Sequence, residues 1–285
     1  MSGARILVAD DDPDIHDLLK SILQDTVAAV DCVSSGREAL ARVEAQAYDL
    51  VLTDVCMPEV DGLELLQRIH ERRPGLPVVV MTALNTQESV IAAIQKNAFA
   101  YFSKPFSPAA VLDMVHRALD GGCALADIEV LSAQPHWLSL RLGCRLETAD
   151  RLVQFLKELQ VDLPPDEQND IAVAFRELLV NAIEHGGRFD PEKKVEVSYI
   201  RISQAILYYV RDPGEGFSFE NLAHAAVGGG ASGNPMSHVE VRMQAGMRPG
   251  GFGILMSRNI ADELIYNEKG NQVLLVKYLP KPDQS

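Results

Sequence analysis

Between residues 5 and 120, short apolar runs alternate with amphipathic segments, and this alternation constrains the fold more than any other feature of the sequence. The strand-like runs occupy residues 5–11, 27–33, 48–54, 77–82 and 98–104. The helical patterns begin near Pro13, Gly36, Gly62, Thr86 and Ser107. Strands that alternate with helices predict an α/β, doubly wound, five-stranded parallel sheet, and nearly continuous apolar strands suit burial on both faces.

Polar residues gather where these predicted strands end. They are Asp10, Asp11, Asp54, Thr82 and Lys104. Ligands of such sheets bind beyond the carboxyl ends of the strands. Three carboxylates at one edge repel one another unless they share a cation, and hard oxygen ligands favour Mg²⁺. The alternative for any single aspartate is a helix N-cap, and Asp12 before Pro13 is predicted to be one.

Four stretches, "VADDDPDI", "LVLTDVCMPEVDGLELL", "VVVMTA" and "YFSKPF", resemble the response-regulator receiver family over its whole length. The resemblance implies a flavodoxin-like receiver domain at residues 1–120. Asp54 would be the phosphoacceptor, Lys104 would bind the phosphoryl oxygens, and Thr82 would turn toward them after phosphorylation. The implied Mg²⁺ ligands are Asp10 (through water), Asp11, Asp54 and the backbone carbonyl of Cys56. The family also implies a cis Lys104–Pro105 peptide and an inward-turning Tyr101.

The alternation stops after Gly121–Gly122, and residues 121–135 are predicted to be a linker. Strands are then expected at 136–142, 195–202 and 205–212, and helices at 146–159 and near 252–262. Another helix should run from "PPDEQND" to "HGG", whose glycines supply a left-handed stop. The segment 263–279 reads as a hairpin that turns at Gly270–Asn271.

Within the helix that ends at "HGG", a carboxylate and an amide lie one turn apart, at Glu177 and Asn181. A solvated outer face is the simpler explanation of such a pair. Two glycine-rich motifs follow, "RDPGEGF" at 211–217 and "RPGGFGILMSRNIADEL" at 248–264. Glycines after strands are usually turns, but glycines that lead into a helix N-terminus also make an anion site.

In this order, the three features resemble the Bergerat-fold, histidine-kinase-like (GHKL) ATPases, and most closely their anti-sigma-factor serine/threonine kinase branch, over about residues 136–280. The resemblance implies an α/β two-layer sandwich at 136–285 that binds ATP and Mg²⁺. Asn181 would hold Mg²⁺, Glu177 would be the catalytic base, and Asp212 would accept a hydrogen bond from the adenine amino group. Close approach of the nucleotide is implied at Gly214, Gly216, Gly251 and Gly253. Arg248, with Arg242 as its rival, would contact the terminal phosphate, and the stretch 218–250 is longer than a minimal lid.

Together the resemblances imply a two-component response regulator whose phosphorylation controls a serine/threonine kinase. A sensor histidine kinase would act upstream, and the substrate would be a STAS-type anti-anti-sigma protein. Two alternatives are an ATP-dependent module that sequesters a sigma factor or STAS protein without transferring phosphate, and a phosphate sink. Both families often dimerise, so a homodimer stays open.

The net charge of −14, without a Lys/Arg stripe, argues against a nucleic-acid partner. No apolar run is long enough to cross a membrane, and the strand-like "RILVA" leaves no room for a signal peptide. The four cysteines lack metal-ligand spacing, which is typical of free thiols in a reducing compartment. We therefore expect a cytoplasmic protein without a membrane partner.

Overall fold

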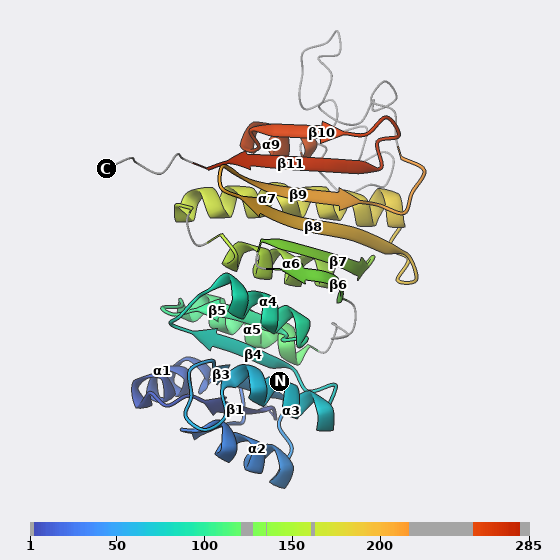
Figure 1. Cartoon of the computed structure of the whole chain (residues 1–285). Coiled ribbons are helices and arrows are strands. Elements are labelled where there is room, and N and C mark those ends of the chain that lie inside the picture. The colour runs from blue at the N-terminus through green and yellow to red at the C-terminus, as the bar shows by residue number, and fades with distance from the viewer. Residues whose placement is uncertain (1–2, 121–127, 135, 161–162, 217–252, 280–285) are drawn as a thin grey trace, which may run out of the picture. The chain divides into compact units, whose positions relative to one another are not determined.

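The computed structural model describes residues 3–120, 128–134, 136–160, 163–216 and 253–279, and the chain divides into two compact units, residues 1–127 and 128–285. The strands of the first unit are β1 (Arg5–Ala9), β2 (Ala29–Val33), β3 (Leu50–Asp54), β4 (Val78–Thr82) and β5 (Ala100–Ser103). Its helices are α1 (Pro13–Leu23), α2 (Gly36–Ala45), α3 (Gly62–Arg72), α4 (Gln87–Gln95) and α5 (Pro108–Leu119). The strands pair in parallel in the order β2-β1-β3-β4-β5, so the predicted doubly wound sheet is confirmed (Figure 1).

Local chemistry explains where the helices of the first unit begin. A side-chain oxygen caps the first turn of each, at Asp12, Ser35, Asp61, Thr86 and Ser107. The predicted cap at Asp12 is therefore confirmed, with Pro13 at the first helical position. Alternate residues of the central strands pack against α1 and α5 in one core, and α2 contacts α3.

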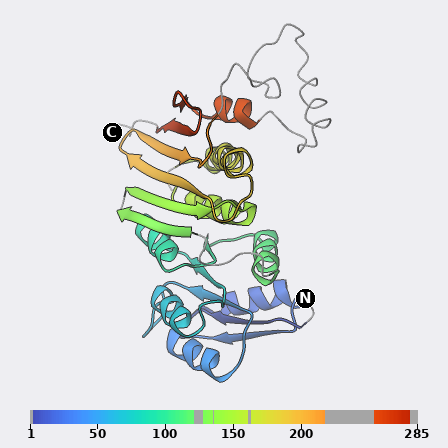
Figure 2. The same ribbon diagram turned by 90° about the vertical axis from the view of Figure 1, so that its right-hand side faces the viewer.

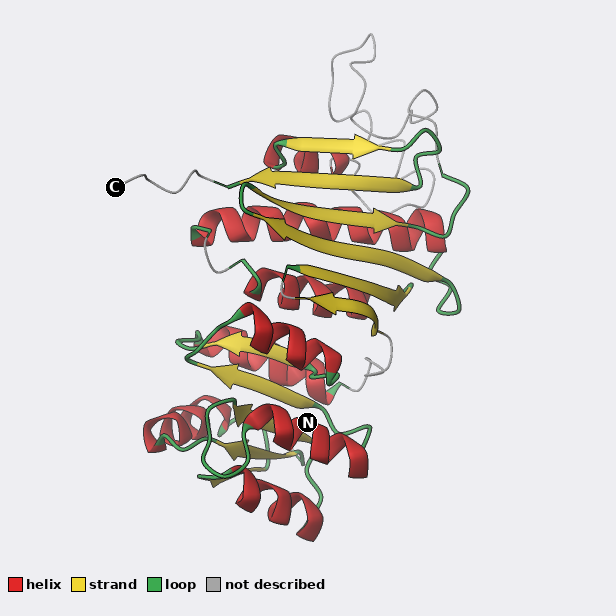
Figure 3. Ribbon diagram, viewed as in Figure 1, coloured by secondary structure: helices red, strands yellow, loops and turns green. Residues whose placement is uncertain are grey.

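The second unit is an antiparallel sheet with helices on one face (Figures 2 and 3). Its strands are β6 (Ile128–Gln134), β7 (Trp137–Gly143), β8 (Lys194–Ile202), β9 (Ala205–Arg211), β10 (Glu263–Tyr266) and β11 (Gln272–Tyr278). The helices are α6 (Leu146–Glu158), α7 (Pro165–Asn181), the π-helical turn η2 (Ala182–Gly187) and α9 (Gly253–Ile260). The strand order is β10-β11-β9-β8-β7-β6, and α7 packs between α6 and α9, which confirms the predicted two-layer α/β architecture.

Three local expectations differ from the structure. Residues 128–134, placed in the predicted linker, form β6, because they pair with β7 from Ile128–Leu142 to Gln134–Trp137. The glycines of "HGG" are not a left-handed stop: they lie inside η2, and the positive φ angles fall on Arg188 (56°) and Phe189 (55°).

The closing hairpin also turns differently. It is closed by the loop 267–271 rather than by a two-residue Gly270–Asn271 turn. The side chain of Asn267 accepts hydrogen bonds from the backbone N–H groups of Asn271 and Gln272, at 3.0 and 3.1 Å, which holds the wider loop.

None of the helices in the described ranges combines the length and apolarity that a membrane span requires.

Candidate functional site

An acidic cluster lies at the carboxyl edge of the first sheet. Asp10 and Asp11 follow β1, and Asp54 ends β3, which is hydrogen-bonded to β1. Carboxylate oxygens of these three residues lie within 4.8 Å of one another. Asp10 is 0% exposed and Asp54 is 5% exposed, whereas Asp11 faces solvent. Two of the three charges are therefore removed from water, where their mutual repulsion is strong.

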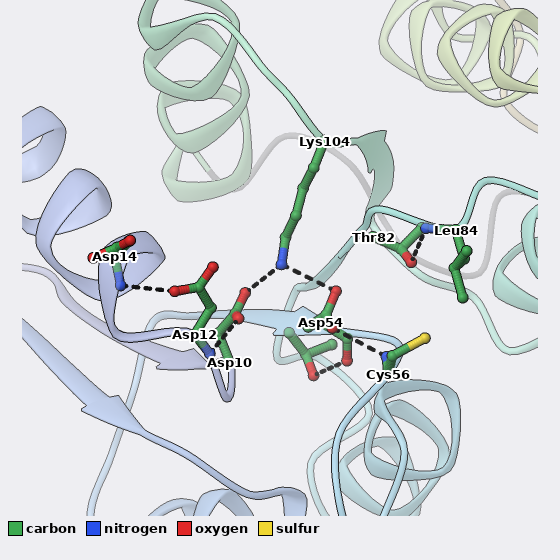
Figure 4. Close-up of polar contacts among 9 residues, drawn as sticks. Asp10, Asp12, Asp14, Asp54, Cys56, Thr82, Leu84 and Lys104 are labelled. Carbon is green, nitrogen blue, oxygen red and sulfur yellow. Dashed lines mark hydrogen bonds and ion pairs between the residues drawn. The ribbon is translucent and has the colours of Figure 1, made fainter.

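Lys104, directly after β5, reaches between two of these carboxylates (Figure 4). Its Nζ donates to Asp10 Oδ2 at 2.7 Å and forms an ion pair with Asp54 Oδ1 at 3.2 Å. The Lys104–Pro105 peptide is cis, as the resemblance implies.

The electrostatics of this cluster are set by burial and by Lys104. Burial raises the pKa of Asp54, and the Lys104 ammonium opposes that rise without cancelling it. Burial lowers the pKa of Lys104, but Asp10 and Asp54 outweigh it, so the pKa of Lys104 lies above its usual value. Lys104 is therefore a cation that offsets only part of the negative charge.

The donor set fits a hard divalent cation. Three carboxylates converge within one ion's reach, and carboxylate oxygen is the ligand type that Mg²⁺ prefers. At Cys56, the backbone N–H donates to Asp54 Oδ2 at 3.1 Å, which holds that carboxylate in place. The Cys56 side chain is exposed.

Thr82 lies at the same edge but outside the ion pairs. It ends β4, is fully buried, and its hydroxyl oxygen accepts from the Leu84 N–H at 3.1 Å (Figure 4). Tyr101 is buried, and its hydroxyl lies 2.7 Å from Ser89 Oγ, so the ring is turned inward.

Sequence reasoning missed the contact of Gly62 with this site. A Cβ at Gly62 would lie 1.9 Å from the backbone oxygen of Asp54. The first residue of α3 thus packs directly on the end of β3, and only glycine leaves room for that approach.

A second candidate site surrounds Asp212, which follows β9. Its Oδ1 accepts from the Gly214 N–H at 2.7 Å, and its own N–H donates to the Asn271 carbonyl at 3.0 Å. Burial raises the pKa of this carboxyl, and the Gly214 N–H opposes the rise. Gly186, at the end of η2, lies against the Asp212 side chain, a neighbour that the sequence did not reveal.

The loop after Asp212 is fixed by the closing hairpin. Gly216 has a φ of 85°, and a Cβ there would lie 1.8 Å from the Lys269 carbonyl oxygen. Asn271 Nδ2 also donates to the Gly214 carbonyl at 3.4 Å. The predicted close-approach residues, Gly214 and Gly216, therefore pack against protein backbone on at least one side.

The other predicted residues of this site are only partly described. Glu177 and Asn181 are half-buried on α7, and Asn181 is its last residue. Gly253 begins α9, whose Ser257 hydroxyl donates to the Ala174 carbonyl of α7 at 3.1 Å. Arg242, Arg248, Gly251 and the whole of the expected lid (218–250) lie outside the described residues.

Comparison with known families matches each unit separately. The family model described as "Response regulator receiver domain" matches residues 6–116, and the one described as "Histidine kinase-like ATPase domain" matches residues 144–277.

Individual relatives match about two fifths of the chain. The DNA-binding transcriptional regulator NtrC of Rhizobium meliloti is 41% identical over 119 residues, which cover 42% of this chain and 25% of that protein. An uncharacterized 14.6 kDa protein of Leptolyngbya boryana is 39% identical over 114 residues, which cover 39% of this chain and 87% of that protein. The chain thus covers about a quarter of the NtrC protein and most of the shorter one. A response regulator receiver domain protein (CheY-like) of Methanospirillum hungatei is a similar solved structure, with 34% identity, a TM-score of 0.41, and coverage of 42% of this chain and 95% of that one.

Proposed function

We propose that this chain, which carries a response regulator receiver domain at residues 6–116 and a histidine kinase-like ATPase domain at residues 144–277, is a phosphorylation-controlled serine/threonine kinase. A sensor histidine kinase donates a phosphoryl group to Asp54, and the ATPase domain phosphorylates a STAS-type anti-anti-sigma protein in the cytoplasm. The acidic cluster with Lys104 is the observation that supports phosphorylation of Asp54. The fixed carboxylate of Asp212 beside two glycines is the observation that supports the kinase step.

The acidic cluster supports phosphoryl transfer to Asp54. A carboxylate oxygen of Asp54 attacks phosphorus, an O–P bond forms, and the P–N bond to the donor histidine breaks. Lys104, already 3.2 Å from Asp54 Oδ1, pairs with the added negative charge. Asp10, Asp11, Asp54 and the Cys56 carbonyl would hold Mg²⁺, which when bound neutralises charge on the transferring group.

A labelling experiment tests the phosphoacceptor. Incubation of the full chain with Mg²⁺ and acetyl phosphate should add one hydroxylamine-labile phosphate, and Asp54→Asn should add none. Asp49→Asn is the matched control. Asp49 directly precedes the first residue of β3, whereas Asp54 is the last, and the Asp49 side chain accepts a hydrogen bond from the Arg5 N–H. Labelling of Asp54→Asn at the wild-type level would remove Asp54 from the proposal.

Residues of the ATPase domain support the kinase step. Asp212 Oδ1 is committed to the Gly214 N–H, which leaves Oδ2 as acceptor for the exocyclic amine of adenine. Glu177 takes the proton of the substrate hydroxyl. The hydroxyl oxygen bonds to the γ-phosphorus of ATP, and the bond between the γ-phosphorus and ADP breaks. Asn181, one turn further along α7, would hold the Mg²⁺ that ATP brings, and Arg248 would face the terminal phosphate.

Transfer of labelled phosphate from ATP to a captured STAS partner tests the kinase step. Glu177→Ala should retain ATP and partner binding but lose about 10²–10⁴-fold in transfer rate. The control is Asp170→Ala, an exposed acidic residue of the same helix. Partner binding without transfer in the wild type would replace the kinase by a sequestration module.

Control by the receiver domain is tested in the same assay. We expect the transfer rate to differ between chains treated with acetyl phosphate and untreated chains, and Asp54→Asn to abolish the difference. Equal rates in both states would refute regulation by Asp54.

A further inference from the structure

Gly186 lies closer to Asp212 than any other amino acid would allow. A Cβ at this position would lie 2.3 Å from Asp212 Oδ1 and 2.4 Å from both Cβ and Cγ of Asp212. Rotation about the side-chain bonds moves Oδ1 and Cγ but leaves the Asp212 Cβ in place. An alanine at 186 therefore displaces the backbone of one residue or the other.

The backbone of Gly186 does not itself require glycine. Among the glycines in the described ranges, positive φ angles occur at Gly216 and Gly270, and Gly186 has none. Its small size is thus explained by the contact with Asp212 rather than by a left-handed conformation.

The π-helical turn brings Gly186 to this contact. η2 continues α7 with a wider turn, and both Gly186 and Gly187 are buried. A Cβ at Gly187 would lie 2.2 Å from Cys144 Sγ and 2.8 Å from Cys144 Cβ, just beyond the end of β7. The two neighbouring glycines therefore make different contacts, one with Asp212 and one with Cys144. Single π turns of this kind are frequent at functional sites.

A second glycine encloses the same carboxylate oxygen. A Cβ at Gly214 would lie 2.8 Å from Asp212 Oδ1 and 2.8 Å from the Gly186 Cα. The Gly214 N–H, at 2.7 Å, is also the donor to Oδ1. Oδ1 is thus held between two glycines, and this fixes the direction in which Oδ2 points.

From this geometry we propose that Gly186 is a positioning residue for base recognition: it admits the Asp212 carboxylate against η2 and so aims Oδ2 at the exocyclic amine of adenine. The inference rests on the proposed nucleotide site. It adds that Gly186 contributes to the preference of this site for adenine. Gly186 acts through Asp212, so its replacement should weaken recognition of the base more than binding of the triphosphate.

The test compares ATP with ITP, whose base has a carbonyl in place of the amine, by titration calorimetry of the full chain in Mg²⁺. Wild type should prefer ATP. In Gly186→Ala the ATP/ITP affinity ratio should fall about 10-fold or more, toward the ratio of Asp212→Asn, while ITP affinity changes little. Gly187→Ala, combined with Cys144→Gly to remove both the clashing Sγ and the clashing Cβ, is the matched control and should keep the wild-type ratio.

A second variant separates positioning from a general structural role. Asp212→Gly removes the three atoms that lie nearest to a Cβ at position 186. In that background Gly186→Ala should change neither the melting temperature nor the affinity for either nucleotide. If Gly186→Ala alone fails to fold, the double variant should fold as Asp212→Gly does.

Three outcomes count against the inference. An unchanged ATP/ITP ratio in folded Gly186→Ala, or an equal loss in the Gly187 control, overturns it. So does an effect of Gly186→Ala that persists in Asp212→Gly. If the wild type binds no ATP, or binds ATP and ITP equally, the proposed nucleotide site itself is refuted. That result is seen without any variant, so it differs from the three outcomes that count against the role of Gly186.

Discussion

Replacing Lys104 by methionine should destabilise the first unit when no divalent cation is present. Lys104 Nζ lies 2.7 Å from Asp10 Oδ2 and 3.2 Å from Asp54 Oδ1, and both carboxylates are buried. The variant leaves these charges facing each other with oxygens within 4.8 Å. At an effective dielectric constant of about 20, two unit charges at that distance repel by about 3 kcal/mol. Loss of one partner of a buried ion pair costs a similar amount, about 3–5 kcal/mol.

The pH dependence of this loss has a definite sign. Without the ammonium, nothing opposes the effect of burial, so the pKa of Asp54 rises further above its unfolded value. The folded state then binds protons more readily than the unfolded state. The destabilisation should be complete above the raised pKa and should shrink as the pH falls through it.

Mg²⁺ should stabilise the variant more than the wild type, because the cation no longer competes with the ammonium for the same oxygens. Amide hydrogen exchange of peptides that cover 5–11 and 50–56 measures the opening free energy locally. Lys20→Met, an exposed lysine of α1, is the control. A loss below about 0.5 kcal/mol at neutral pH without Mg²⁺, or a weaker Mg²⁺ response than that of wild type, would refute the reasoning.

Three further changes have expected outcomes. Gly62→Ala places a Cβ 1.9 Å from the Asp54 carbonyl oxygen and should cost about 1–3 kcal/mol in urea denaturation, whereas Gly75→Ala meets nothing within 4 Å and should stabilise by about 0.4–1 kcal/mol. The reverse order would contradict the packing argument. Ser257→Ala removes the bond to the Ala174 carbonyl and should lower the stability of the second unit by about 1 kcal/mol, followed through the fluorescence of the single tryptophan; no change would show that the bond is dispensable. Because burial raises the pKa of Asp54, its carboxyl in the chain without Mg²⁺ should titrate at a higher pH than an ordinary aspartate, as followed by NMR, and titration in the ordinary range would contradict this.

The sequence predicted the first sheet and the convergence of its strand-end residues for one reason. In a parallel sheet the carboxyl ends of neighbouring strands lie at the same edge, so Asp10, Asp54 and Lys104 had to meet there. The pattern did not predict which carboxylates Lys104 contacts or how deeply they are buried. These depend on side-chain conformations and on α3 packing against β3 at Gly62.

The second unit shows where local patterns fail. The segment "IEVLSAQ" has a weak strand pattern, and β6 exists because its backbone pairs with β7. Two glycines at a helix end ordinarily indicate a left-handed stop. Here close contacts with Asp212 and Cys144 explain why residues 186 and 187 are glycines. The left-handed conformation occurs at Arg188 and Phe189 instead. Those contacts join segments far apart in the chain, so no local window contains them.

Both candidate sites share one structural device. In each, an acidic residue at or just after the end of a strand is approached by a glycine at a helix end: Gly62 at the start of α3 meets the Asp54 backbone, and Gly186 at the end of η2 meets the Asp212 side chain. Gly62 contacts backbone atoms and Gly186 contacts side-chain atoms, and this difference decides how an alanine substitution affects the protein. At Gly62 the methyl group opposes backbone and displaces the strand end itself, so stability should fall with function. At Gly186 the opposing atoms all belong to the Asp212 side chain, so the backbone displacement that alanine causes should disappear once Asp212 is shortened to glycine.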